Sequence, residues 1–127
     1  MRRWVLLRTP WLQVVVHQIL KADPPGLHDH PWWNVSVVLR GKLYENRADD
    51  ARILTPGCVV FRRATDVHKI TPLGGPVWTL FITGRARRLW GYRRTNPDRW
   101  VPWPLEAADR AQHSGGAIKH GEPWRSR

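Results

Sequence analysis

The sequence contains a single cysteine, Cys58, and this excludes an internal disulfide framework of the kind that small secreted domains use. No segment approaches the roughly 20 consecutive apolar residues that a membrane-spanning helix requires. The basic, apolar start of the chain reaches Arg8 and Pro10 before a signal-peptide core can form. We therefore expect a cytoplasmic protein that does not insert into a membrane.

Acidic residues are also scarce, with 10 Asp and Glu against 21 Lys and Arg, so that the formal net charge is +11. Basic side chains interleave with Trp90 and Tyr92 over residues 85–94, a pattern that can hold a phosphate backbone and stack on bases. The same pattern also fits a solvated strand face. Nucleic acid is therefore a possible but secondary partner, because charge alone supports conclusions about solubility more securely than about partners.

Phenylalanine and tyrosine occur only twice each, whereas tryptophan occurs nine times. A chain of 127 residues fits one domain. Short β-type runs alternate with Pro and Gly turns, and no amphipathic helix is evident, which favours an all-β sandwich or barrel. The expected strands are Trp4–Leu7, Trp11–Leu20, Trp33–Leu39, Lys42–Arg47, Arg52–Leu54, Cys58–Arg62, Val67–Ile70, Val77–Thr83 and Arg87–Tyr92.

The boundary of the barrel is expected near Pro104. Residues 1–104 contain the strand pattern, and within it Arg40-Gly41 is interpreted as a tight turn that joins two strands of a hairpin. Residues 105–127 are interpreted as a basic C-terminal tail: 105–112 can form a short helix, and 113–127 has the composition of a mobile segment.

The most informative segment contains two histidines, His28 and His30, separated by Asp29. Residues two apart on a strand point to the same face, so both imidazoles can reach one metal ion. His68 can supply a third ligand from a neighbouring strand. Three neutral imidazoles suit a divalent transition metal such as Fe, Ni, Zn, Mn or Cu and leave positions open for water or substrate. Taken alone, a His-x-His pair more often consists of two surface residues that bind no metal.

The histidine pattern resembles the cupin superfamily. The first cupin motif, G-x5-H-x-H-x3–4-E-x6-G, is matched by His28, His30 and Gly41, with Asn34 at the position of the glutamate. The second motif, G-x5-P-x-G-x2-H-x3-N, is matched by Gly57 and His68. Its other positions are occupied by Arg63, Thr65 and Pro72.

This resemblance covers residues 11–92 and implies a double-stranded β-helix, the jelly-roll barrel, with a metal ion in its mouth. The segments 27–32, 37–41 and 77–81 are similar to small uncharacterised cupins of bacteria and phages. By resemblance, the protein is a mononuclear metal-dependent enzyme acting on a small molecule, with oxygenase chemistry preferred and isomerase or lyase chemistry next. The alternative is a non-catalytic metal- or metabolite-binding module. A homodimer is also implied.

Two further residues are candidates for supporting the metal. Asn34 is a poor ligand, so we expect it to hydrogen-bond a metal-bound water or a neighbouring group. His17 lies among apolar residues, which is usual for a core histidine, although in a barrel it can also approach the metal as a fourth ligand.

Candidates for catalysis and for substrate binding lie on neighbouring strands. Glu45 and Tyr44 are alternative catalytic residues, since one of them must face inward, and Glu45 is the nearer general base. An inward-facing arginine could hold a substrate carboxylate; the candidates are Arg40, Arg62 and Arg63. Four tryptophans are interpreted mainly as core: Trp32, Trp33, Trp78 and Trp90.

Overall fold

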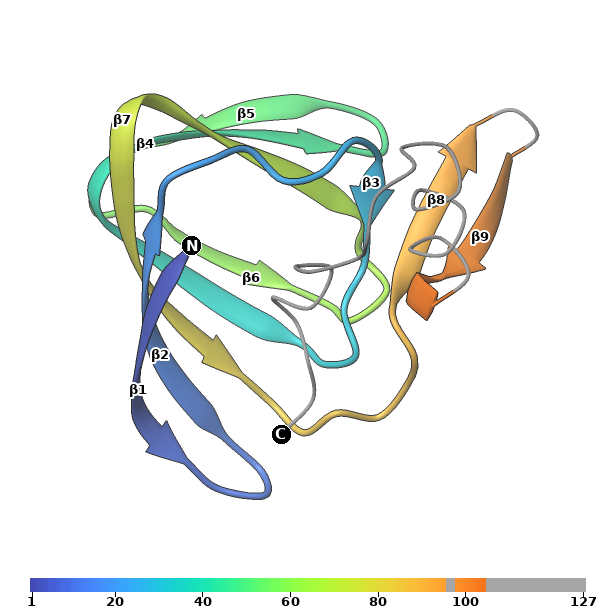
Figure 1. Ribbon diagram of the computed structural model, residues 1–127, viewed down its shortest axis with the longest axis horizontal. Helices are drawn as coiled ribbons and strands as arrows, with labels where there is room; N and C mark the ends of the chain where they lie inside the picture. Colours follow the sequence, from blue (N-terminus) through green and yellow to red (C-terminus); the bar gives the residue numbers. More distant parts are fainter. Residues whose placement is uncertain (96–97, 105–127) are drawn as a thin grey trace.

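The structure, a computed structural model, describes residues 1–95 and 98–104 (Figure 1). These residues form nine β-strands: β1 (Arg2–Arg8), β2 (Gln13–Ile19), β3 (Leu27–His28), β4 (Asn34–Arg47), β5 (Ala51–Leu54), β6 (Val59–Arg62), β7 (His68–Thr83), β8 (Gly91–Thr95) and β9 (Asp98–Pro102). The expected all-β architecture is confirmed. The expected tail, with its short helix over 105–112, lies outside the described residues, so the division at 104 remains a prediction.

The two long strands β4 and β7 form the spine of the fold. They pair antiparallel along nearly their whole length, from Asn34 opposite Thr83 to Arg47 opposite His68. On its other edge β7 pairs with β2 and β3, and the sheet continues in the order β1-β2-β7-β3-β8-β9. β5 and β6 pair with successive parts of β4. The strands consequently wrap around a common interior (Figure 1).

The expected hairpin at Arg40-Gly41 is wrong, because β4 continues through these residues without a turn. Gly41 has a φ of +87°, and the register of β4 against β7 shifts between Val38 and Lys42. A Cβ at Gly41 would lie 2.9 Å from the carbonyl oxygen of Pro76. The glycine therefore forms an irregularity that bends a continuous strand, which is the usual effect of a β-bulge. Residues 71–76, which lie between the expected strands Val67–Ile70 and Val77–Thr83, are likewise part of β7.

The alternation of buried and exposed residues places the core inside the curved sheet. Along β2, buried side chains alternate with partly exposed ones. One buried cluster is aliphatic and the other is aromatic. The first contains Ile19, Val38, Leu43, Leu54, Val60, Ile70 and Val77, and the second contains Trp32, Phe81, Trp90 and Tyr92. Trp33 and Trp78 were expected in the core, but they lie on the partly exposed side of their segments.

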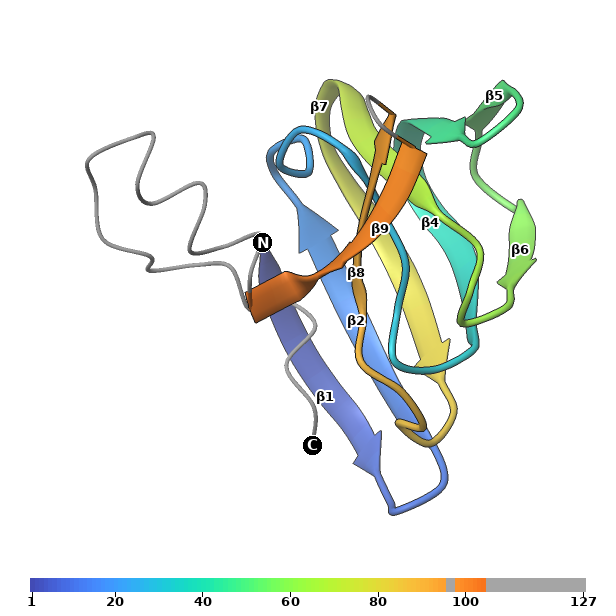
Figure 2. The same ribbon diagram turned by 90° about the vertical axis from the view of Figure 1, so that its right-hand side faces the viewer.

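The β8–β9 hairpin closes the interior on the side of β3 (Figure 2). Asp29 anchors this hairpin: its carboxylate accepts hydrogen bonds from the backbone N–H of Gly91 at 2.7 Å and from the indole N–H of Trp100 at 2.9 Å. Arg88 pairs with the same carboxylate at 2.8 Å. Within the described part of the chain, no helix is long and apolar enough to cross a membrane.

Candidate metal centre

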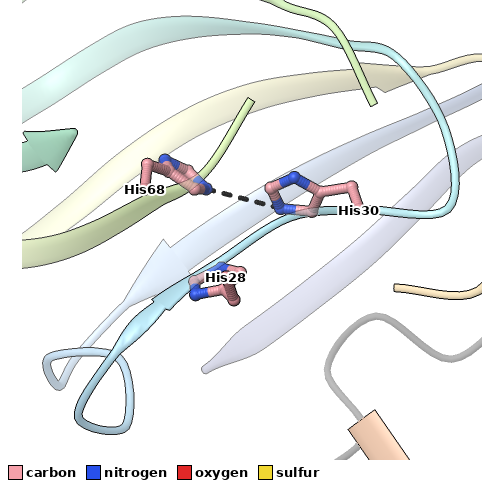
Figure 3. A group of neighbouring side chains, drawn as sticks. All are labelled: His28, His30 and His68. Carbon is pink, nitrogen blue, oxygen red and sulfur yellow. Dashed lines mark hydrogen bonds between the residues drawn. The ribbon is translucent and has the colours of Figure 1, made fainter. Parts of the chain in front are cut away.

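Three buried histidines meet in the interior of the barrel. His28 on β3 lies directly opposite His68, the first residue of β7, and His30 follows in the segment that leads to β4. One ligand nitrogen from each ring lies within 4.8 Å of the others. The Nε2 atoms of His30 and His68 are 3.4 Å apart and face each other, with His28 beside them (Figure 3). The structure thus brings together the three histidines that the sequence singles out.

A buried carboxylate fixes the orientation of His68. Its Nδ1 is 2.7 Å from Oε2 of Glu45, which is fully buried on β4. Since an ionised carboxylate only accepts hydrogen bonds, Nδ1 of His68 carries the hydrogen, and in the neutral ring Nε2 presents a lone pair. A carboxylate behind a ligating histidine is the usual arrangement in protein metal sites.

Glu45 is held in turn by two arginines. Arg62 on β6 is buried and donates from Nε to Glu45 Oε2 at 2.6 Å, and the Nε of Arg52 on β5 donates to Oε1 at 2.6 Å. The carboxylate is therefore fully engaged and charge-compensated. This arrangement corrects the expectation that an inward arginine holds a substrate carboxylate: Arg62 does face inward, but its partner is Glu45.

Asn34, at the position of the cupin glutamate, belongs to the same network. Its side-chain oxygen accepts a hydrogen bond from Arg62 Nη1 at 3.0 Å, and Arg62 also donates to the Ser36 hydroxyl at 2.9 Å. The amide nitrogen of Asn34 is buried and has no hydrogen-bond partner in the part of the chain that the structure describes. Arg62 therefore orients the amide and leaves its N–H groups available to a ligand.

The other two histidines have different surroundings. Trp32 stacks on the ring of His30 at 5.1 Å with an interplanar angle of 17°. His28 lies against Tyr92, with ring centroids 5.8 Å apart, and its Nε2 is 3.8 Å from the carboxylate of Asp23. Burial raises the pKa of Asp23 to about 6, although its hydrogen bond from the Ile70 N–H acts in the opposite direction. Aromatic rings thus form much of the wall around the histidines.

Electrostatics favour neutral imidazoles at this site. Burial holds the pKa of His30 well below its usual value, and the neighbouring His68 and His28 lower it further. Burial likewise lowers the pKa of His68, with the positive charge of Arg62 as the next cause. Neutral rings are the form that ligates metal ions.

The geometry of the facing nitrogens fits a metal ion. Two imidazole nitrogens bound tetrahedrally to one Zn²⁺, each at about 2.0–2.1 Å, are about 3.3–3.4 Å apart. The observed separation of 3.4 Å between His30 and His68 equals this value. The donor set of three imidazoles also suits Fe, Ni and Cu.

Two other expected residues lie apart from the histidine cluster. His17 on β2 is buried against Phe81, with ring centroids 4.8 Å apart, and Trp32 stands between Phe81 and His30 in a chain of ring contacts. Tyr44 is 36% exposed and points to the opposite side of β4 from Glu45. The strand alternation therefore selects Glu45 as the inward residue of that pair.

A cavity of about 300 Å³ adjoins the network from the side of β4, β5 and β6. Its wall includes His68, Glu45, Arg52 and Arg62, but neither His28 nor His30. Basic and acidic side chains both line this cavity, and some of them form ion pairs, as Arg47 does with Asp50 and Arg63 with Asp66.

Comparison with known proteins identifies the architecture. An uncharacterised protein with a double-stranded β-helix domain from Klebsiella pneumoniae matches with a TM-score of 0.60 and 19% identity, over 73% of this chain and 84% of its own. An RmlC-like cupin from Shewanella frigidimarina matches with a TM-score of 0.58 and 22% identity, over 68% and 77%. The chain has the cupin fold. The expected double-stranded β-helix is therefore confirmed.

A third cupin-fold neighbour is the DMSP lyase DddQ from Ruegeria pomeroyi, with a TM-score of 0.57 and 20% identity over 65% of this chain and 46% of that one. No family model matches the sequence. No curated protein matches it either.

The sequence does not predict the hydrogen-bond network that orients His68, which consists of Glu45, Arg62 and Asn34. The Glu45–His68 hydrogen bond joins positions 23 residues apart, and Arg62 to Asn34 spans 28. The sequence pattern favours Glu45 as a base and Arg62 as a substrate anchor, and it does not single out Asp23. The alternation of β4 and β6 could have placed Glu45, Asn34 and Arg62 inside, but their mutual contacts depend on how the strands pair.

Proposed function

We propose that His28, His30 and His68 bind one divalent transition-metal ion. The observation that carries this proposal is the convergence of three buried imidazoles, of which one is oriented by a buried carboxylate. The 3.4 Å separation of two facing nitrogens adds support, because it is the spacing that a tetrahedral ion imposes. Asn34 is not a ligand in this proposal; its buried amide N–H groups, which have no hydrogen-bond partner among the described residues, are proposed to donate to a small molecule bound in the site.

We further propose that the protein is a metal-dependent enzyme that acts on a small molecule, with oxygenase chemistry preferred. When bound, the ion supplies Lewis-acid or redox chemistry at its open positions. Glu45 holds His68 in one orientation, Arg62 holds Asn34, and the aromatic walls exclude water. Isomerase or lyase chemistry is the next alternative, and the lyase among the structural neighbours supports it.

The charges around the cluster favour an anionic substrate. Three neutral imidazoles leave the charge of a divalent ion uncompensated, and Asn34 stands where cupins carry a glutamate. Glu45 is already paired with Arg52 and Arg62, and Asp23, whose carboxylate is 3.8 Å from Nε2 of His28, supplies at most one negative charge. A carboxylate or enolate would therefore bind more favourably at the open positions than a neutral or cationic molecule.

Elemental analysis of the purified protein tests the metal site. We expect about one metal ion per chain and loss of that metal in the His30→Ala/His68→Ala variant. The matched control is His17→Gln, which replaces another buried histidine outside the cluster and should keep the metal. Equal metal in the wild type and the double variant would contradict the proposal.

A substrate screen separates the enzyme from a non-catalytic binding module. Oxygen consumption by the Fe(II)-loaded protein would be followed across thiols, amino acids and enols, with the His30→Ala/His68→Ala variant as the blank. Turnover above the blank supports the oxygenase. Tight ligand binding without turnover of any compound supports the binding module instead.

A role in nucleic-acid binding has less support. Arg88, in the basic stretch 85–94, is paired with Asp29 and lies over the ring of Trp100 at 5.4 Å. This arginine therefore holds the β8–β9 hairpin and is engaged within the protein. Binding to DNA that weakens steeply with added salt would restore this alternative.

A further inference from the structure

Asp23 carries a carboxylate that is largely buried and has no basic side chain paired with it. Its side chain is 10% exposed, and within the described part of the chain its ion-pair partner is the imidazole of His28, whose Nε2 is 3.8 Å from Oδ2. The positive charges of Lys69 and Arg62 act on this carboxylate only from beyond ion-pair distance. A buried charge without close compensation opposes folding.

Two other carboxylates beside the histidines are compensated within the protein. Glu45, which bonds to His68, is paired with two arginines. Asp29 is paired with Arg88 and anchors the β8–β9 hairpin. Of these three carboxylates, Asp23 therefore keeps a negative charge that a bound cation can compensate.

Two hydrogen bonds with Ile70 fix the position of this carboxylate. The backbone N–H of Asp23 donates to the carbonyl oxygen of Ile70 at 3.0 Å, and the N–H of Ile70 donates to Oδ2 of Asp23 at 2.8 Å. Pro24 follows Asp23 and restricts its backbone to extended conformations. Ile70 lies two residues after His68 on β7, so the loop is tied to a strand that carries a candidate ligand. The carboxylate is thus held in place without an ion.

We infer that Asp23 supplies the negative charge of the metal centre, from the loop before β3. This inference rests on the proposed metal site, in which Asn34 stands where the cupin motif has a glutamate. Three neutral imidazoles bring no negative charge to a divalent ion, whereas Asp23 brings one beside the ring of His28. Opposite charges at such short range attract strongly in a protein interior. The histidines remain the ligands, and Asp23 acts through its charge.

This role makes metal affinity and metal-free stability respond differently to loss of the charge. Asp23→Asn removes the charge but keeps an oxygen that can accept the hydrogen bond from the Ile70 N–H. Metal affinity should fall about 10–100-fold, the range typical of residues that support the ligands of a metal. The metal-free variant should be at least as stable as the wild type, because the substitution removes a buried, uncompensated charge.

Zn²⁺ binding and urea unfolding of the full chain test the inference. Competition with a metal-binding dye gives the Zn²⁺ affinity, and unfolding in the presence of a chelator gives the metal-free stability. The matched control is Asp49→Asn, which removes the same charge from an exposed carboxylate and should leave Zn²⁺ affinity unchanged. Asp23→Ala also removes the acceptor for the Ile70 N–H, so it should lower both Zn²⁺ affinity and stability.

The outcomes separate this inference from the metal site itself. Equal Zn²⁺ affinity in the wild type and in Asp23→Asn overturns the inference and leaves the three-histidine site standing. A wild type that binds no Zn²⁺ overturns both. An equal loss of affinity in Asp49→Asn would assign the effect to the overall charge of the protein, and a less stable metal-free Asp23→Asn would make Asp23 a structural residue. Either of these results also overturns the inference.

Discussion

At the scale of single residues, the two nitrogens of His68 have separate roles. Nδ1 bonds to the buried Glu45, and Nε2 faces His30. The carboxylate thereby selects the tautomer whose lone pair points into the cluster. In the proposed metal site, Glu45 is a positioning residue, because its own oxygens are occupied by His68, Arg52 and Arg62.

Substitution Glu45→Gln should therefore weaken metal binding without removing a ligand. Loss of the carboxylate behind a ligating histidine typically lowers metal affinity about 10–100-fold, and we expect a decrease in about that range here. The buried Arg62 also loses its counter-charge, so the metal-free protein should lose about 3–5 kcal/mol in free energy of unfolding. Competition with a metal-binding dye and urea unfolding measure the two effects.

The control for this substitution is Asp50→Asn, which removes a comparable ion pair to Arg47 at the surface. Solvent screens an exposed ion pair, so this variant should resemble the wild type in both measurements. Wild-type metal affinity in Glu45→Gln would show that the carboxylate does not position His68.

The three metal-binding candidates His28, His30 and His68 were predictable from the sequence, but the residues that contact and orient them were not. Residues two apart on a strand share a face, so His28 and His30 could be paired without the structure. His68 was placed by its position in a recognised motif. Asp23, by contrast, meets His28 only because the loop before β3 folds back and is anchored by the Ile70 N–H. No local pattern encodes such a contact.

At the scale of elements, the positions of strands were largely predictable and their connections were not. A run rich in Val and Ile predicts β2, and an almost continuous apolar run over Val77–Thr83 predicts the second half of β7. At Gly41 the sequence does not distinguish a turn from a bulge, because a glycine with positive φ serves equally in both. The pairing of β4 with β7 over their full length decides between the two, and that pairing joins segments distant in sequence.

Substitution of Gly41 should test the bulge directly. Gly57→Ala is the matched control: its φ is +93°, and a Cβ there meets nothing within 4 Å. The control should cost about 1–2 kcal/mol for the left-handed backbone alone. Gly41→Ala should cost about 1–3 kcal/mol more, because its Cβ also crowds Pro76 and Val77. Equal unfolding midpoints in urea for the two variants would contradict this close approach.

At the scale of the whole molecule, the interior combines buried polar groups with two apolar clusters. His17, His28, His30 and His68 are all buried, and the first lies beyond the aromatic rings that separate it from the others. Burial is the main cause that lowers the pKa of His17 to about 3, and the positive charge of Arg3 is the next. Folding therefore keeps this ring neutral well below the usual pKa of 6.5.

The metal-free protein should consequently lose stability in acid, and His17 should account for part of the loss. Below pH 6.5 the unfolded chain protonates His17, whereas the folded chain does so only near pH 3. The unfolded state then binds more protons, so the free energy of unfolding falls as the pH falls, by at most about 1.4 kcal/mol per pH unit for one group. His17→Gln does not titrate and should lack this part of the slope.

Subtracting the two stability profiles isolates His17, because every other buried group is common to both proteins. Asp23 is one such group: its raised pKa, about 6, makes a contribution of the opposite sign between pH 3.8 and 6. The measurement is urea unfolding in the presence of a chelator, repeated from about pH 7 to about pH 4, a window that contains the usual histidine pKa. The free energies of unfolding of the wild type and His17→Gln should approach each other as the pH falls. Parallel profiles would mean that His17 is protonated equally in both states, and hence that the aromatic wall does not desolvate it.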